Sequence, residues 1–151
     1  MRSPDFDIKT TWLAISKMYN VRAMREDITT NIGFVLIHID EEKGTPATKI
    51  APLMGMEPRS LTRMLATLEE KGFISRKADE KDGRVVRIFL TPLGIEKRQV
   101  ARDVVKAFNV AIYKKVAPEK MDIFFEVIDE VNKLVKDTYQ SYMAEGETID
   151  R

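Results

Sequence analysis

The sequence predicts a mostly α-helical protein that carries one small β-hairpin. Apolar residues recur at steps of three and four over most of the chain, as they do on the buried face of a helix. Residues 84–91 instead alternate with the period of a strand, and the pair Asp82-Gly83, a hairpin signal, comes just before them. Prolines stand at several of the expected helix starts.

The composition excludes several kinds of site. The chain has 151 residues, of which 44% are hydrophobic and 32% are charged, as expected for one domain with a sizeable core. Because it has no cysteine, disulfides, thiolate nucleophiles and cysteine-ligated metals are excluded. Its single histidine, His38, would have to carry any Ser-His-Asp centre, so we expect no enzyme and no cofactor.

The sequence also lacks the usual signals for a membrane or for export. No apolar run is long enough to span a bilayer, and the first residues lack the apolar core of a signal peptide. We therefore expect a cytoplasmic protein with no membrane partner.

Two helices are predicted at the start of the chain. The first covers residues 8–24, where Trp12 and Ile15 continue an apolar stripe at helical spacing. The second begins near Thr30 and stops before Gly44, since glycine easily adopts the left-handed conformation of a helix end. This second helix is apolar on nearly all sides, so it should be buried.

A short third helix is predicted next. Thr45 would cap it, Pro46 would occupy its first turn and Gly55 would end it. Pro52 lies within it and removes an amide donor, so we expect a kink or an irregular turn there.

The fourth helix is predicted to begin at Pro58 and to end at Gly72. Leucines at steps of four and three supply its buried stripe. These are Leu61, Leu65 and Leu68.

The hairpin and two further helices complete the predicted fold. The strands are expected within residues 73–79 and 84–91. Thr91 and Pro92 then cap and start a long helix, which Pro118 breaks by starting another. That last helix carries a narrow apolar seam of the kind used against a partner helix, made of Met121, Phe124, Ile128, Val131 and Val135.

The net charge of +1 conceals an uneven distribution. Residues 43–98 hold 12 Lys or Arg against 7 Asp or Glu, a net charge of +5, while the segments on either side carry −2 each. A basic centre between acidic ends favours a polyanion as the partner of that centre.

The order of the elements, helix, turn, helix and hairpin, is that of a winged helix-turn-helix, which favours double-stranded DNA as the partner. The helix at residues 58–71 turns groove-reading side chains outward: Arg59, Ser60, Thr62, Arg63 and Thr67. In the hairpin we expect a minor-groove contact from Arg84 and phosphate contacts from Arg76, Lys77, Lys81 and Arg87. The simpler interpretation of these side chains is a solvated, charged surface.

Three stretches carry a more specific pattern. They are residues 61–72, which read Leu-Thr-Arg-Met-Leu-Ala-Thr-Leu-Glu-Glu-Lys-Gly, the triplet Asp82-Gly83-Arg84, and Leu-Thr-Pro-Leu-Gly at residues 90–94. Together they resemble the multiple-antibiotic-resistance regulator (MarR) family of bacterial transcription factors, and the resemblance spans nearly the whole chain. It implies an obligate homodimer on a pseudo-palindromic operator, with Arg84 in the minor groove and Asp82 orienting the local arginines.

We accordingly predict that residues 1–29 and 92–143 form a helical dimerisation region, residues 30–91 the winged helix-turn-helix, and residues 144–151 a tail. The expected function is sequence-specific regulation of transcription, with repression favoured over activation. A winged helix that binds only proteins is the main alternative. An enzyme would depend on His38.

The resemblance also implies a small aromatic or lipophilic effector, bound between the dimer region and the DNA-binding lobe. We predict that Trp12, Tyr19, His38 and Met54 surround such a pocket. The alternative interpretation is ordinary core packing, because aromatic and methionine side chains at helical spacing commonly serve that purpose.

Overall fold

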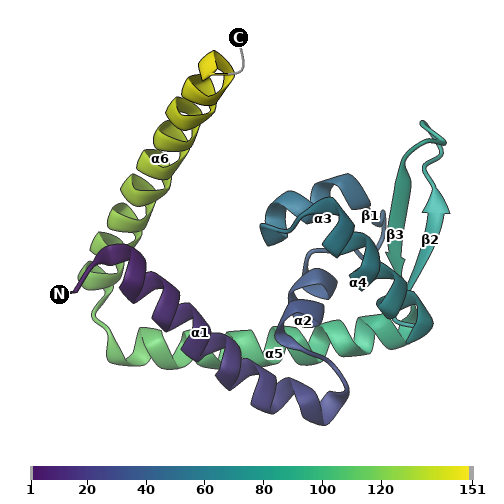
Figure 1. Ribbon diagram of the computed structural model, residues 1–151. Coiled ribbons are helices and arrows are strands. Elements are labelled where there is room, and N and C mark those ends of the chain that lie inside the picture. Colours follow the sequence, from purple (N-terminus) through teal and green to yellow (C-terminus); the bar gives the residue numbers. More distant parts are fainter. Residues whose placement is uncertain (1, 150–151) are drawn as a thin grey trace. The chain divides into compact units, whose positions relative to one another are not determined.

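A computed structural model describes residues 2–149 of the chain and the side chains of residues 2–145. The chain divides into two compact units, one up to Ala107 and one from Phe108 onward. In chain order the elements are α1 (Pro4–Ala23), η1 (Met24–Glu26), α2 (Thr30–Ile37), β1 (Thr45–Pro46), α3 (Ala47–Met54), α4 (Pro58–Glu70), β2 (Ile74–Ala78), β3 (Val86–Leu90), α5 (Pro92–Lys115) and α6 (Pro118–Ile149). The predicted fold class, helices with one hairpin wing, is confirmed (Figure 1).

The core of the first unit lies between α2, α3, α4 and the sheet. Val35, Leu36, Ile50, Leu68 and Ile88 are completely buried there. The leucine stripe predicted for α4 points into this core, which leaves the opposite face of α4 in solvent.

The sheet contains a third strand that the sequence analysis missed. β1, at Thr45 and Pro46, pairs antiparallel with β3, so the strand order is β1-β3-β2. The prediction that Thr45 caps α3 was therefore wrong: Pro46 is the N-cap, and the Thr45 hydroxyl accepts from the Asp40 amide over 2.9 Å and donates to the His38 carbonyl over 3.3 Å. A two-residue strand has no periodicity to detect, and only its partner strand defines it.

One predicted helix end changes, and α3 continues past Pro52. α2 ends at Ile37, well before Gly44, and the turn that follows is held by the Asp40 side chain, which accepts from the Lys43 amide over 2.7 Å. Pro52 lies inside α3 and the helix continues to Met54, so there is no irregular turn at Pro52, and the kink stays a prediction. Because proline has no N–H, the Thr48 carbonyl lacks its helical donor. Thr48 and Pro52 are both exposed, so solvent can bond to that carbonyl instead.

The connection between α1 and α2 is fixed by a side-chain network. Thr29 caps α2 by accepting from the Ile32 amide over 3.3 Å. Next to it, the Thr30 hydroxyl donates to the Ser16 carbonyl over 3.0 Å, and the Thr30 amide donates to the Asn20 side chain over 2.7 Å. α1 is thereby held against the start of α2.

The second unit contains the end of α5 and all of α6. The sequence analysis placed a tail from residue 144 on, whereas α6 remains helical to Ile149. The two residues that follow Met143, Ala144 and Glu145, are good helix formers, so the sequence does not end the helix at Met143. The last two residues of the predicted tail lie outside the described part.

Candidate nucleic-acid interface

One face of α4 is exposed to solvent, whereas the opposite face packs on the core. Leu61, Leu65 and Leu68 are at most 3% exposed and anchor the helix on the core. The predicted groove-reading residues, Arg59, Ser60, Thr62, Arg63 and Thr67, are all exposed. The structure therefore brings these five side chains onto a single solvent face.

The two threonines on this face offer acceptors and methyl groups. The Thr62 hydroxyl donates its proton to the Pro58 carbonyl over 2.9 Å, and Thr67 donates to the Arg63 carbonyl over 3.3 Å. Because each hydroxyl proton is used within the helix, what faces outward is an oxygen lone pair and a methyl group. The exposed arginines supply the donors.

The hairpin β2–β3 extends past α3 and α4 within the first unit, as Figure 1 shows, and Asp79 lies near its tip. The Asp79 side chain accepts from the amides of Lys81 over 2.9 Å and Asp82 over 3.2 Å. Its second oxygen accepts from Arg87 Nε over 2.7 Å. These bonds, with that from Arg87 the largest effect, hold the pKa of Asp79 below its usual value.

At the very tip, Asp82 and Arg84 form a second contact. Asp82 Oδ1 accepts from the Arg84 amide over 3.1 Å and from Arg84 Nε over 3.2 Å. The Arg84 side chain is nevertheless 92% exposed. Its guanidinium is thus steered locally while its outer nitrogens face solvent.

The other basic side chains of the hairpin have partners within the protein. Arg76 Nε donates to Glu69 over 2.7 Å, which joins β2 to the end of α4 and holds the pKa of Glu69 below its usual value. The Lys77 ammonium lies 5.2 Å from the centre of the Phe89 ring. Lys81, in contrast, is exposed at the tip.

The sequence analysis treated Arg87 as a phosphate contact, and it missed Asp79. The structure places the Arg87 guanidinium on the Asp79 carboxylate and within 3.1 Å of the Lys43 carbonyl. A signal was available, because a hairpin closing at Asp82-Gly83 brings opposite charges on its two arms together.

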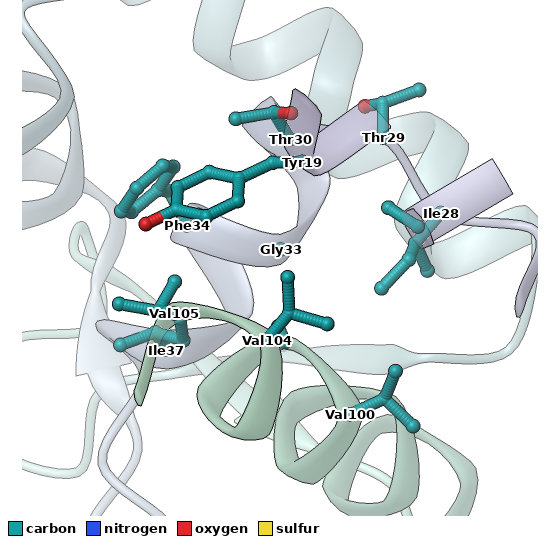
Figure 2. A pocket seen from close by; sticks show the side chains of 12 residues that line it. Tyr19, Ile28, Thr29, Thr30, Gly33, Phe34, Ile37, Val100, Val104 and Val105 are labelled. Carbon is teal, nitrogen blue, oxygen red and sulfur yellow. The ribbon is translucent and has the colours of Figure 1, made fainter. Parts of the chain in front are cut away.

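A small apolar cavity lies between α1, α2 and α5. Figure 2 shows the Tyr19 and Phe34 rings near one end of it, Ile28 near the other, and Val104 below Gly33. Its volume is about 20 Å³, roughly the space of one water molecule. Burial raises the pKa of Tyr19 above its usual value.

The four residues predicted to surround a pocket do not share this cavity. Of them, Tyr19 alone is among the described residues that line it. Trp12 reaches it indirectly, through a ring contact with Phe34 at 5.7 Å between centroids. His38 hydrogen-bonds through Nδ1 to the Phe34 carbonyl over 2.7 Å and borders a separate polar depression, and Met54 packs on the core. Residue type alone could not separate the two sides of α2.

Two further searches cover the described residues. None of the helices there is both long enough and apolar enough to cross a membrane. Within the same part of the chain, no group of three histidine or acidic side chains could hold a metal ion.

The α4 helix and the hairpin define a winged helix-turn-helix fold, and comparison with known proteins shows which family this segment resembles. Residues 28–86 match the model of the MarR family. The HTH-type transcriptional regulator YhbI of Bacillus subtilis (strain 168) is 26% identical over 110 residues, which cover 73% of this chain and 71% of YhbI. Within residues 28–86 the chain thus resembles the MarR family, and YhbI, which it resembles over most of its length, is described as a transcriptional regulator.

Solved structures of similar fold include complexes. The S. aureus MepR–DNA complex has a TM-score of 0.82 at 17% identity, covering 89% of this chain and 99% of that chain. CouR from Rhodococcus jostii RHA1, bound to p-coumaroyl-CoA, has a TM-score of 0.75 at 19% identity, covering 84% and 90%. At these identities the likeness establishes the fold.

Proposed function

We propose that this protein binds a pseudo-palindromic DNA operator as a homodimer in the cytoplasm and represses transcription until a small molecule releases it. The observation that carries the proposal is the exposed face of α4, which combines arginine donors with hydroxyl acceptors and methyl groups beside a wing ending in Arg84. Repression would follow from occupancy, because a protein seated on two grooves blocks access to a promoter.

The DNA contacts divide by chemistry. Arg59, Ser60 and Arg63 near the start of α4 would read base edges in the major groove, with Thr62 and Thr67 contacting bases or phosphates. Arg84 would enter the minor groove, where its outer nitrogens meet the most negative potential, and Lys81 would bind phosphate. The fold likeness to a DNA-bound MepR supports this arrangement.

The homodimer is supported by apolar surface that a monomer would leave in water. On α6 the exposed large apolar side chains are Ile123, Phe124, Phe125, Val127, Leu134, Val135, Tyr139, Tyr142 and Met143. On α1, Phe6, Trp12 and Leu13 are 57%, 46% and 57% exposed. Exposed apolar side chains in such number on each of these helices mark an interface, and a second copy of the chain would bury them.

Release by an effector would work through the cavity beside Tyr19. At about 20 Å³ it is too small for an aromatic ligand, so binding would have to move α5 relative to α2. A ligand that binds the opened arrangement more tightly shifts the equilibrium away from the arrangement that fits DNA. At saturation, the shift equals the ratio of the ligand's affinities for the two arrangements. The ligand-bound CouR of similar fold supports this regulation.

Selection of bound sequences from random duplexes, using the full chain, tests the proposal. We expect two inverted half-sites whose centres lie about 34 Å apart, one turn of DNA. Affinity for a selected site should fall steeply with salt. Recovery of a site without a repeated half-site would overturn the dimer geometry, and the absence of salt-sensitive DNA binding would favour a module that binds only proteins.

A further inference from the structure

We propose that Asp79 and Arg87 are positioning residues that fix the wing tip to the body of the protein, so that Arg84 meets DNA in a preformed conformation. In this proposal Arg87 itself binds no phosphate. The inference deepens the proposed function and rests on it, because it assumes that Arg84 contacts DNA.

Asp79 uses both carboxylate oxygens to close the tip. Oδ1 accepts from the backbone amides of Lys81 and Asp82, and Oδ2 accepts from Arg87. Asp82 in turn accepts from Arg84. One of the two amides bonded to Asp79 therefore belongs to Asp82, the residue that orients Arg84.

Arg87 connects this tip to a distant segment. Its Nε and Nη2 contact Asp79, while Nη1 donates to the carbonyls of Lys43 over 3.1 Å and Gly44 over 3.3 Å. All three guanidinium nitrogens thus contact the protein, and the side chain is only 28% exposed. A phosphate would have to displace a carboxylate to reach the same donors.

The segment that Arg87 contacts lies close against β3 and is closed by a side-chain hydrogen bond. Gly44 has a φ of 63°, and a Cβ there would lie 2.6 Å from the Ile88 carbonyl oxygen. The Lys43 amide donates to Asp40 over 2.7 Å. Arg87 therefore ties the wing to a turn whose backbone has little freedom.

The contacts of Asp79 reduce the conformational entropy that the wing tip would lose on binding DNA. A hairpin tip without these bonds would sample many conformations, and DNA binding would have to select one of them. With Asp79 in place, that ordering is completed during folding. The hydrogen bonds that lower the pKa of Asp79 extend the range in which it is charged further into acid, so the contact with Arg87 persists below neutral pH as well.

The test compares Asp79→Asn with Glu80→Gln, since both remove one negative charge at adjacent positions of the wing. Simple electrostatics predicts slightly tighter DNA binding for both. We expect Asp79→Asn instead to weaken binding to a selected site by about three- to tenfold, the cost of ordering one flexible side chain or turn. The exposed Glu80→Gln should not weaken it.

A double-mutant cycle separates positioning from general damage. If Asp79 acts through Arg84, then Asp79→Asn should have little further effect in an Arg84→Ala protein, whereas independent damage would add. Arg87→Lys keeps the charge but loses the fork, so it should weaken binding without lowering the salt dependence. Two results together would overturn the proposal. In Arg87→Ala, the slope of log affinity against log salt concentration would fall by about one unit, and Asp79→Asn would bind DNA as tightly as the wild type.

Amide hydrogen exchange gives a readout without DNA. The Lys81 and Asp82 amides should exchange faster in Asp79→Ala, which offers them no side-chain acceptor, than in Glu80→Ala, at equal thermal stability of the first unit. Unchanged exchange would overturn the positioning role. If the wild-type protein bound no duplex while exchange changed as expected, the proposed function would fail but the order of the wing would stand.

Discussion

Gly94 illustrates how a short sequence pattern encodes a tertiary contact. A Cβ at this position would lie 1.8 Å from the Phe73 carbonyl oxygen, so a side chain cannot be accommodated without moving the backbone. Just before it, the Thr91 hydroxyl accepts from the Gly94 amide over 3.0 Å and donates to the Gly72 carbonyl over 2.6 Å. The Leu-Thr-x-x-Gly pattern therefore fixes the start of α5 against the end of α4.

Gly94→Ala is expected to destabilise the protein by about 3 kcal/mol, because the clash is with backbone rather than with a flexible side chain. Urea denaturation followed by circular dichroism measures the change. Gly83→Ala is the matched control: among the described atoms nothing lies within 4 Å of its added Cβ, so its effect should stay within about 0.5 kcal/mol. Equal effects of the two substitutions would refute the packing argument.

At the level of elements, the Glu69–Arg76 ion pair joins α4 to β2 of the hairpin. Glu69 has a lowered pKa, chiefly because Arg76 hydrogen-bonds to it, relative to an ordinary value of 4.5. A carboxyl whose folded pKa is depressed contributes stability above its unfolded pKa and loses it as pH falls through the folded pKa. The contribution is thus present at neutral pH and lost in acid.

Glu69→Gln should therefore lower stability at pH 7, and the difference from wild type should shrink as pH falls into acid through the lowered pKa, where the wild-type carboxyl is itself protonated. Urea denaturation across that pH range measures the difference. Glu70→Gln, at the exposed neighbouring position, should show no such pH-dependent loss. A loss that persists unchanged in acid would mean that packing, rather than charge, links the two elements.

α4 itself is expected to carry base recognition. Arg63→Ala should cost about 1 to 3 kcal/mol in binding to a selected operator and relax preference at one base position, because a directional contact is lost. Competition between operators that differ at single positions measures this. An equal loss on all operators for Arg63→Ala would contradict its assignment to a base.

Lys81→Ala should instead lower the slope of log affinity against log salt concentration by about one unit on every sequence.

For the whole molecule, the apolar seam of α6 should decide the oligomeric state. Val135→Glu places a carboxylate at a position that is 62% exposed in the single chain and that a dimer would bury. Burial of an unpaired charge is costly, so the dimer dissociation constant should rise by about a hundredfold or more. Sedimentation equilibrium at several concentrations measures it.

Lys133→Glu provides the control on the same helix. Lys133 lies about 200° around the helix from Val135, within a polar face, so its replacement should leave the dimer intact. If the wild-type chain sedimented as a monomer at all concentrations, the dimer proposal and the two-half-site geometry would both fail.

The sequence was most informative where a signal was local. Pro58, Pro92 and Pro118 mark the first residues of α4, α5 and α6, because the fixed φ of proline suits the first turn of a helix and its missing N–H costs nothing there. The leucine stripe of α4 identified both the buried face and, by exclusion, the displayed face. These patterns require only neighbours along one helix.

What only the tertiary structure decided involves residues that are far apart in the sequence. β1 exists because β3 pairs with it, and Arg87 reaches Asp79 and the Lys43 carbonyl because the hairpin folds beside the turn after α2. The cavity likewise collects Tyr19 and Val104 from helices that the linear pattern treats separately. The sequence by itself determined the helices, the wing and the basic face, since each follows from local backbone and side-chain preferences. Pairing between distant segments depends on how those elements pack, and packing is a property of the whole fold.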